Sequence, residues 1–146
     1  MREKSAMSGS GVFLIELLLA ILIFAVASAV CLKIFVTAHQ VSTESSKLNQ
    51  AVIAAQSAAE CFKAAKGNIG ETATLLGTDS EVSADSVIVR FDETWDVLPQ
   101  ESAYEYVLEL KRLSAQSGCI DGEVEVCDVW GGLIFSIPVS VMEVAR

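Results

Sequence analysis

The sequence predicts an α+β protein in which one long N-terminal helix packs on a small antiparallel sheet. Residues 12–66 contain neither Pro nor Gly, so nothing in them interrupts a helix. The first part of this stretch is apolar throughout, and the second part is amphipathic. Beyond it, short runs alternate apolar and polar residues, which is typical of half-buried strands.

The apolar part of the helix is long enough to cross a membrane. Residues 12–32 carry one charge, on Glu16, and at ~1.5 Å per residue they span roughly 30 Å, the thickness of a hydrocarbon core. Arg2 and Lys4 on the short preceding flank favour a cytoplasmic N-terminus and export of the rest. We therefore expect a single-pass protein of the cytoplasmic membrane with an exported C-terminal domain.

Three kinds of N-terminal segment could account for this pattern. The first is a secretory signal peptide cut at the small residues Ala27 or Ala29, but apolar residues continue to position 36. The second is a lipoprotein signal ending at Cys31, but Val30 stands where a small residue is needed. The third is a short leader removed after Gly11, with its small residues 8–11 accessible and extended and the apolar helix retained.

The third pattern resembles a known export signal. Gly11, residues 12–15, Glu16 and the apolar run behind them resemble the class III signal of type IV prepilins and type II secretion pseudopilins. In that family a prepilin peptidase cuts after the glycine and N-methylates the new first residue, which the resemblance assigns to Val12. The family also carries an acid five residues into the mature chain, which corresponds to Glu16.

The chain departs from this family pattern in two places. The first mature residue is usually Phe or Met, and here it is Val12. Many major pilins carry a helix-kinking Pro about two-thirds along the apolar segment, whereas this chain has Cys31, Leu32 and Lys33 there. The second departure favours a minor pilin or a pseudopilin over a main fibre subunit.

The resemblance implies a pilin-like fold and a structural role. The expected ranges are a leader over 1–11, a transmembrane and filament-core helix over 12–36, an amphipathic continuation over 37–66 and a globular sheet domain over 67–146. The implied partners are prepilin peptidase, other pilin or pseudopilin subunits, an inner-membrane assembly platform and the membrane. The mature chain would end in a cell-surface or periplasmic filament, a fimbrium or a secretion structure. The alternative is a membrane-anchored extracytoplasmic binding or sensor module with an uncut leader.

Glu16 has a physical reason to pair with an N-terminus. An acid inside an apolar helix is costly, and an intramembrane acid therefore indicates function. Cleavage after Gly11 would create an amine on Val12 at the same membrane depth, and the two charges attract strongly in a low-dielectric setting. Docking beside a neighbouring subunit's N-terminus would then give a register for assembly. The simpler alternative is that Glu16 reaches the membrane interface.

Composition argues against nucleic-acid binding and against catalysis. The chain has 10 basic and 19 acidic residues, a net charge of −9, with most of the acid after residue 70. Such a domain repels phosphates, so we expect no direct nucleic-acid binding. The only histidine is His39, near the membrane exit, and no nucleophile–base constellation or Gly-rich phosphate loop is present. We expect no enzyme and no cofactor.

The four cysteines do not match a zinc pattern. Cys31 and Cys61 lie on the long helix, and Cys119 and Cys127 lie in the C-terminal domain. A Cys119–Cys127 disulfide is the candidate in an oxidising compartment, with a bridge from Cys61 as the other option. We expect no metal ion. Asp79, Glu81 and Asp85 could bind calcium in a loop, but they lack EF-hand spacing, and the interpretation as a solvated loop is favoured.

The second half of the helix has a stripe that indicates contact with a core. Its members recur at helical spacing: Val41, Leu48, Val52, Ala55, Ala59 and Phe62. Gly67 and Asn68 supply the stop, and residues 67–86, which are rich in Gly, Thr, Ser and acid, are predicted to connect the helix to the sheet.

Four strands are expected in the C-terminal domain, around residues 87–91, 104–110, 123–126 and 133–141. Turns are expected at 121–122 and, as a two-residue hairpin, at 131–132. Pro138 lacks a ladder donor and indicates an edge strand or a bulge. For Trp95 and Trp130, core packing is favoured over a role as surface anchors.

Overall fold

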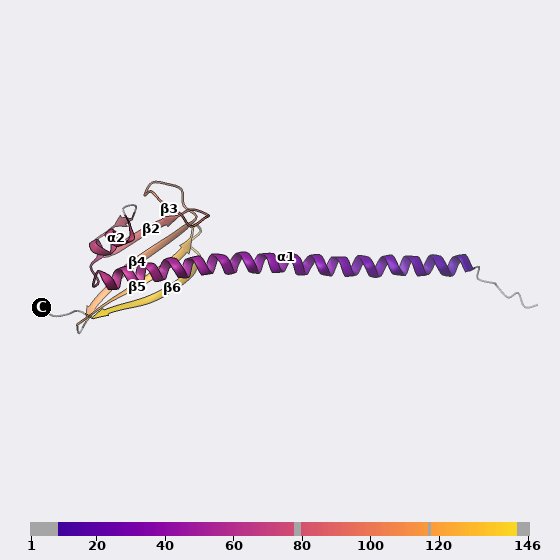
Figure 1. Ribbon diagram of the computed structural model, residues 1–146, viewed down its shortest axis with the longest axis horizontal. Helices are drawn as coiled ribbons and strands as arrows, with labels where there is room; N and C mark the ends of the chain where they lie inside the picture. Colours follow the sequence, from indigo (N-terminus) through magenta and orange to yellow (C-terminus); the bar gives the residue numbers. More distant parts are fainter. Residues whose placement is uncertain (1–8, 78–79, 117, 143–146) are drawn as a thin grey trace, which may run out of the picture. The chain divides into compact units, whose positions relative to one another are not determined.

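The computed structural model describes residues 9–77, 80–116 and 118–142. A long helix, α1 (Gly9–Ala64), is followed by a short helix, α2 (Ile69–Leu76), and by a six-stranded antiparallel sheet (Figure 1). The chain divides into two compact units between Glu44 and Ser45. The predicted α+β architecture is confirmed. Below, the described residues of 45–142 are called the head.

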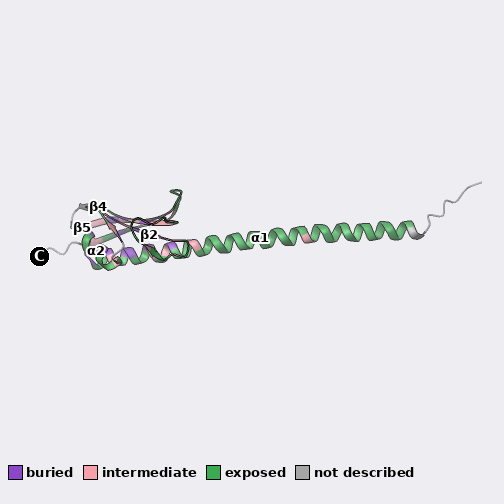
Figure 2. Ribbon diagram, turned by 90° about the horizontal axis from the view of Figure 1, so that it is seen from above, coloured by how far each residue is buried: buried purple, intermediate pink, exposed green. Residues whose placement is uncertain are grey.

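The described residues of the N-terminal unit, 9–44, are helical, and from residue 11 onward their side chains face outward. Every side chain from residue 11 to 44 is exposed except Ser28, which is half-buried (Figure 2). The Ser28 hydroxyl donates to the Phe24 carbonyl oxygen at 2.8 Å, and Thr37 donates to Lys33 at 2.9 Å. Such bonds satisfy a hydroxyl within its own helix and let it lie in an apolar medium.

In the head, the last part of α1 presents a face of small residues to the sheet. The buried positions follow spacings of four and three along one side: Ala51, Ala55, Ala58 and Phe62, with Ala65 directly after the helix. Val41 and Leu48, which the stripe was expected to include, are 60% and 46% exposed. The buried face therefore starts later than periodicity predicts, because the sheet reaches only that far along the helix.

The sheet has the order β1–β2–β4–β5–β6, with β3 paired to β2. The strands are β1 (Glu81–Val82), β2 (Ser86–Phe91), β3 (Val97–Leu98), β4 (Tyr106–Gln116), β5 (Cys119–Asp128) and β6 (Leu133–Met142). Alternate residues of the four long strands form the core with α1: Val87, Val89, Phe91, Leu108, Leu110, Val124, Val126 and Val139. Their register aligns apolar residues across strands, so one face of the sheet is buried.

Phe62 is the central contact between helix and sheet. Its side chain is fully buried, and its ring lies over Gly122 of β5. A Cβ on Gly122 would come within 3.2 Å of the Phe62 ring and 3.0 Å of the Lys111 carbonyl oxygen. Gly122 therefore leaves room in strand β5 for the aromatic ring and does not form a turn. The turn expected at 121–122 is wrong, since β5 runs straight through it.

The end of α1 turns back in a Schellman motif. The Gly67 N–H donates to the Phe62 carbonyl at 2.9 Å and the Lys66 N–H to Lys63 at 3.0 Å. Lys66 and Gly67 have φ of 51° and 77°. A Cβ on Gly67 would lie 2.9 Å from Ile120, so the glycine is needed for space as well as for conformation.

The connector after this turn is more regular than expected. Asn68 caps α2, its side-chain oxygen accepting from the Glu71 N–H at 3.2 Å. Ile69, Thr72 and Ala73 of α2 are buried. The predicted connector over 67–86 thus contains a helix that the sequence analysis did not identify, because burial of one face stabilises a helix too short to be recognised from its pattern.

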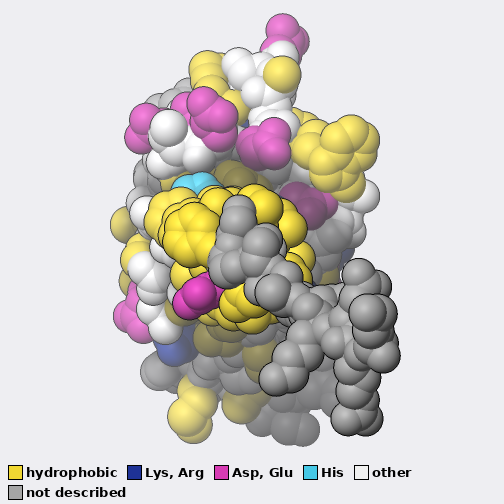
Figure 3. Space-filling model, turned by 90° about the vertical axis from the view of Figure 1, so that its right-hand side faces the viewer, with side chains coloured by type: hydrophobic (Ala, Val, Ile, Leu, Met, Phe, Trp, Pro, Cys, Tyr) yellow, Lys and Arg dark blue, Asp and Glu magenta, His cyan; other side chains and the backbone are white. Residues whose placement is uncertain are grey.

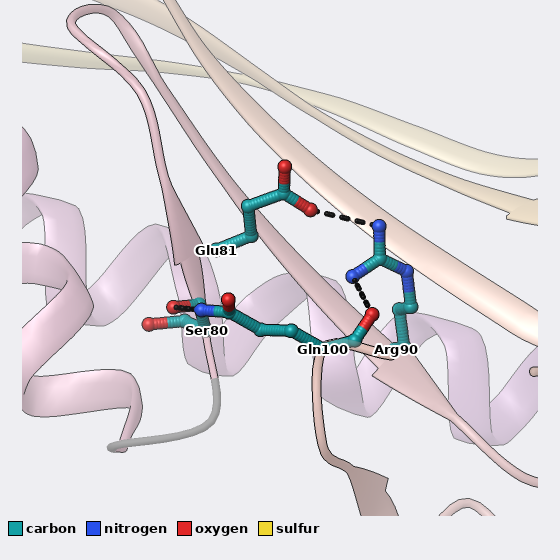
Figure 4. A network of polar contacts seen from close by, with 4 residues as sticks. All are labelled: Ser80, Glu81, Arg90 and Gln100. Atoms are coloured by element: carbon teal, nitrogen blue, oxygen red, sulfur yellow. Dashed lines mark hydrogen bonds and ion pairs between the residues drawn. The ribbon is translucent and has the colours of Figure 1, made fainter. Parts of the chain in front are cut away.

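An arginine network joins the short strands at one edge of the sheet. Arg90 of β2 donates to the Gln100 carbonyl oxygen at 2.8 Å and to the Glu81 carboxylate at 2.7 Å. The Gln100 side chain donates in turn to the Ser80 carbonyl at 3.0 Å (Figure 4). The network holds β1 and the loop after β3 to β2.

At the opposite edge, β6 pairs with β5 and with no other described strand, as Pro138 indicates. Between these strands, the predicted two-residue hairpin is replaced by a loop over residues 129–132. The Asp128 carboxylate accepts from the Trp130 N–H at 3.0 Å and the Gly132 N–H at 2.7 Å, which fixes the loop. Trp130 is 90% exposed, so the expectation of core packing is wrong for this residue.

Candidate functional site

The residues of the predicted processing and assembly site lie at the start of α1. Gly11, Val12 and Glu16 are helical and exposed, and a Cβ on Gly11 would have no neighbour within 4 Å. The extended backbone expected over 8–11 is wrong for residues 9–11. Glycine costs about 1 kcal/mol relative to Ala in a helix, so Gly9 and Gly11 leave this first turn easy to open.

Val12 and Glu16 lie on one face of the helix. Their separation of four residues places their side chains one turn apart on the same side. No acid stands in the first turn of α1, and within the described residues Glu16 forms none of the ion pairs. Its carboxylate is therefore available to a cation from outside the chain or to an amine created at Val12.

Within the described part of the chain, the surroundings of Glu16 are apolar and contain no ion-pair partner. The helix is strongly apolar over a membrane-length stretch, and that stretch is exposed throughout. Figure 3, which views the helix from its N-terminal side, shows hydrophobic side chains around it. By length and composition the helix could cross a membrane, and its exposure distinguishes it from the core helix of a soluble protein, although not from a signal sequence.

The candidate disulfide does not form. Cys119 and Cys127 lie at the two ends of one continuous strand, β5. Eight residues at ~3.4 Å each separate them by roughly 27 Å, whereas bridged Cα atoms lie within about 7 Å. Cys61 is also a free thiol, so the bridge from the helix is absent as well. Burial raises the pKa of the Cys61 and Cys127 thiols, which disfavours the reactive thiolate.

Two of the three carboxylates considered as calcium ligands form ion pairs with arginines. Glu81 pairs with Arg90 and Asp85 with Arg112, while Asp79 lies outside the described residues. In the described part of the chain, no three His, Cys, Asp or Glu side chains lie close enough together to hold a metal ion. These carboxylates serve the fold by bonding to strands β2 and β4.

An aromatic cluster in the head was missed by sequence reasoning. Trp95 stacks on Tyr106 with ring centroids 4.4 Å apart and an interplanar angle of 10°, and Phe91 lies 5.6 Å from Trp95. The Lys47 ammonium lies 5.0 Å from the Tyr106 ring centroid and 3.9 Å from the Asp128 carboxylate. Trp95 thus packs on the core edge, as expected. Desolvation, with nearby acids, raises the pKa of Tyr106.

Next to this cluster the head has an apolar groove of about 250 Å³, between α1, α2 and strands β2 to β4. Its lining is Gln50, Ile53, Ala54, Ser57, Leu76, Val89, Phe91, Trp95, Val97 and Leu108. The volume is below the ~300–1,000 Å³ of ordinary small-molecule sites. The sequence carries one sign of the groove, which can be recognised only once the structure is known: Ile53 is a large residue among the small residues of the helix, at a position outside the buried stripe.

Comparison of the chain with protein-family models, with curated proteins and with solved structures found no match.

Proposed function

We propose that this chain is a structural subunit, a minor pilin or pseudopilin, of a type IV pilus-like or type II secretion-like filament. Prepilin peptidase would cut it after Gly11 and methylate Val12, and the chain would assemble through its N-terminal helix. The observation that carries the proposal is one coincidence: a glycine, an acid five residues later and an exposed apolar helix stand in register.

The exposed helix supports assembly through that segment. Contiguous exposed apolar surface on a protein marks a membrane or protein interaction site. Before assembly, lipid would cover the helix over 12–36; in a filament, the same helices of other subunits would cover it. An inner-membrane assembly platform would transfer the subunit from one environment to the other, delivering it to a cell-surface or periplasmic filament.

Glu16 supplies the element of specificity. Apolar helices slide past one another with little preference, whereas a buried carboxylate needs its cation at one position. The amine of a mature Val12 on the neighbouring subunit would fill this role. The amine of its own Val12, one turn away on the same face, is the competing partner.

Mass spectrometry of the mature protein tests the proposal directly. In cells that contain prepilin peptidase, the expected N-terminus is N-methyl-Val12. Gly11→Val is the matched control: a side chain there obstructs the extended backbone that a peptidase must grip, and an uncut, membrane-inserted precursor should accumulate. An intact Met1 in the wild type, or normal processing of Gly11→Val, would reject the assignment.

The second candidate is a membrane-anchored extracytoplasmic binding or sensor module with an uncut leader. The apolar groove favours it, since a binding module needs a site in its head. The same mass measurement separates the two functions: the module keeps residues 1–11, and the filament subunit loses them.

A further inference from the structure

The apolar groove of the head has an acidic rim. Phe91 at the end of β2, Trp95, and Val97 at the start of β3 contribute to its lining. The loop that joins these two strands carries Asp92, Glu93 and Asp96, and these three acids are called the rim. Within the described residues, the ion pairs involve other acids, so these three charges have no cation.

The rim is rigid rather than a loose acidic loop. The Asp92 carboxylate accepts from the Thr94 N–H at 2.8 Å, the Thr94 hydroxyl at 2.7 Å and the Asp96 N–H at 3.0 Å. Trp95 adopts φ 67° and stacks on Tyr106. The loop therefore holds its tryptophan in the groove lining, while Glu93 is exposed and takes part in none of these hydrogen bonds.

Exposed apolar side chains complete the opening. Ile53 of α1 and Val97 of β3 line the groove and are 53% and 47% exposed. Lys47, whose ammonium lies near the Tyr106 ring of the aromatic cluster, is engaged by Asp128 and by that ring. An apolar floor with an uncompensated acidic rim is the surface that fits an apolar side chain flanked by Lys or Arg.

The head of a second copy does not have that chemistry. Residues 45–142 carry six basic and fifteen acidic side chains, a net charge of −9. Two such heads repel one another, and a net charge of this size keeps a protein from self-association. The groove is also too small for most small-molecule ligands.

We infer that the groove is a docking site for a basic, apolar segment of a different protein chain. One Leu- or Phe-sized side chain enters between Ile53 and Val97, and a neighbouring Lys or Arg pairs with Glu93 or Asp96. The inference does not depend on processing after Gly11, because every residue in it belongs to the head.

Binding of a short amphipathic Leu–Lys peptide to the full chain in nanodiscs tests this inference. Trp130→Phe leaves Trp95 as the only tryptophan, so its fluorescence reports occupation of the groove, with empty nanodiscs as the blank. We expect saturable binding that weakens with salt. Ile53→Ser and Glu93→Lys should each reduce affinity about tenfold, since one removes an apolar contact and the other reverses a rim charge.

Glu101→Lys is the matched control, because it makes the same charge change on an exposed residue that lies after β3 and outside the loop that carries the rim. It should leave the affinity within a factor of two to three. Equal binding by Ile53→Ser, Glu93→Lys and the parent would overturn the inference, as would equal binding of a Leu–Glu peptide. Sedimentation that detects head-to-head association abolished by Ile53→Ser would assign the groove to a second copy instead.

Discussion

At the scale of single residues, Glu16 is the charge whose partner matters most to the proposed assembly. It stands in the first turns of an exposed apolar helix and forms no ion pair within the described chain. A carboxylate in this setting is tolerated in lipid at a cost of roughly 2.5–3.5 kcal/mol if it lies near mid-bilayer. Its retention is therefore best explained by a use in the assembled state.

Replacing Glu16 by Leu should separate insertion from assembly. The helix becomes more favourable in lipid, so membrane insertion and removal of residues 1–11 should continue. Incorporation into sheared filaments should fall about tenfold or more, because the neighbouring Val12 amine is left unpaired in an apolar core. Glu16→Asp, which keeps the charge on a shorter stem, should be intermediate.

Quantitative immunoblots of filament and membrane fractions measure the effect. Equal incorporation of Glu16→Leu and the wild type would reduce Glu16 to a tolerated interfacial acid, while N-terminal processing would still be judged separately by mass. A loss of both processing and insertion would point to a folding defect rather than to the charge.

A second residue-scale prediction concerns the acidic loop of the head. Hydrogen bonds from the Thr94 side chain first, and then from the Asp96 and Thr94 backbone, hold the pKa of Asp92 below its ordinary value of 3.8. A depressed folded pKa means that the bonds stabilise the loop fully above the ordinary value and are lost as pH falls through the folded value. The loop should therefore loosen only below about pH 3.8.

Carboxyl NMR titration measures this pKa, and Thr94→Val is its control. Removing the hydroxyl deletes the first-named bond, so the Asp92 pKa should move upward toward its ordinary value. An unchanged pKa in Thr94→Val would show that the backbone donors alone account for the shift.

At the scale of elements, the contact of α1 with β5 holds the head together. Phe62 is fully buried over Gly122, and Ala-sized neighbours on α1 allow the close approach. Phe62→Ala should lower the free energy of unfolding by about 3–5 kcal/mol, because it removes apolar burial and leaves a cavity that rigid strands cannot fill.

Leu48→Ala on the same helix is the matched control. Sequence periodicity places Leu48 and Phe62 on one stripe, but only Phe62 is buried. Leu48→Ala should change the free energy of unfolding by no more than about 0.5 kcal/mol. Denaturant unfolding followed by Trp fluorescence measures both, and similar losses would mean that the buried face extends further along α1.

At the scale of the whole molecule, the two units differ in whether their apolar side chains are exposed or buried. The N-terminal unit exposes its apolar side chains, whereas the buried core clusters in the head. A fragment starting at Ser45 should therefore be soluble and fold cooperatively without detergent, since it keeps the core-forming part of α1 and the sheet.

Circular dichroism and thermal unfolding of that fragment provide the measurement. We expect one transition, with a melting temperature within a few degrees of the head transition of the full chain. A fragment starting at Gly67 is the control, and it should not fold because the sheet loses the cover provided by Phe62 and the alanines. A folded control fragment would show that the helix is dispensable to the core.

Local patterns determined the elements whose signals lie in neighbouring residues. The absence of Pro and Gly over 12–66 predicted the long helix, and alternation predicted the four long strands and their buried face. Pro138 predicted an edge strand correctly, because the lack of a donor is a property of that residue wherever it stands. The spacing of Gly11 and Glu16 at the start of the apolar helix can likewise be recognised in the sequence, and the function assigned to it remains a prediction.

Only the tertiary structure decided features that depend on residues far apart in the chain. The start of the buried stripe depends on how far the sheet reaches along α1, which moves its beginning from Val41 to Ala51. The two cysteines of β5 stay apart because the strand continues through Gly122, a glycine that makes room for Phe62 rather than a turn. The groove beside Trp95 exists because α1, α2 and the sheet enclose it together. Periodicity reports which side of an element is apolar, whereas contact between elements sets what that side meets.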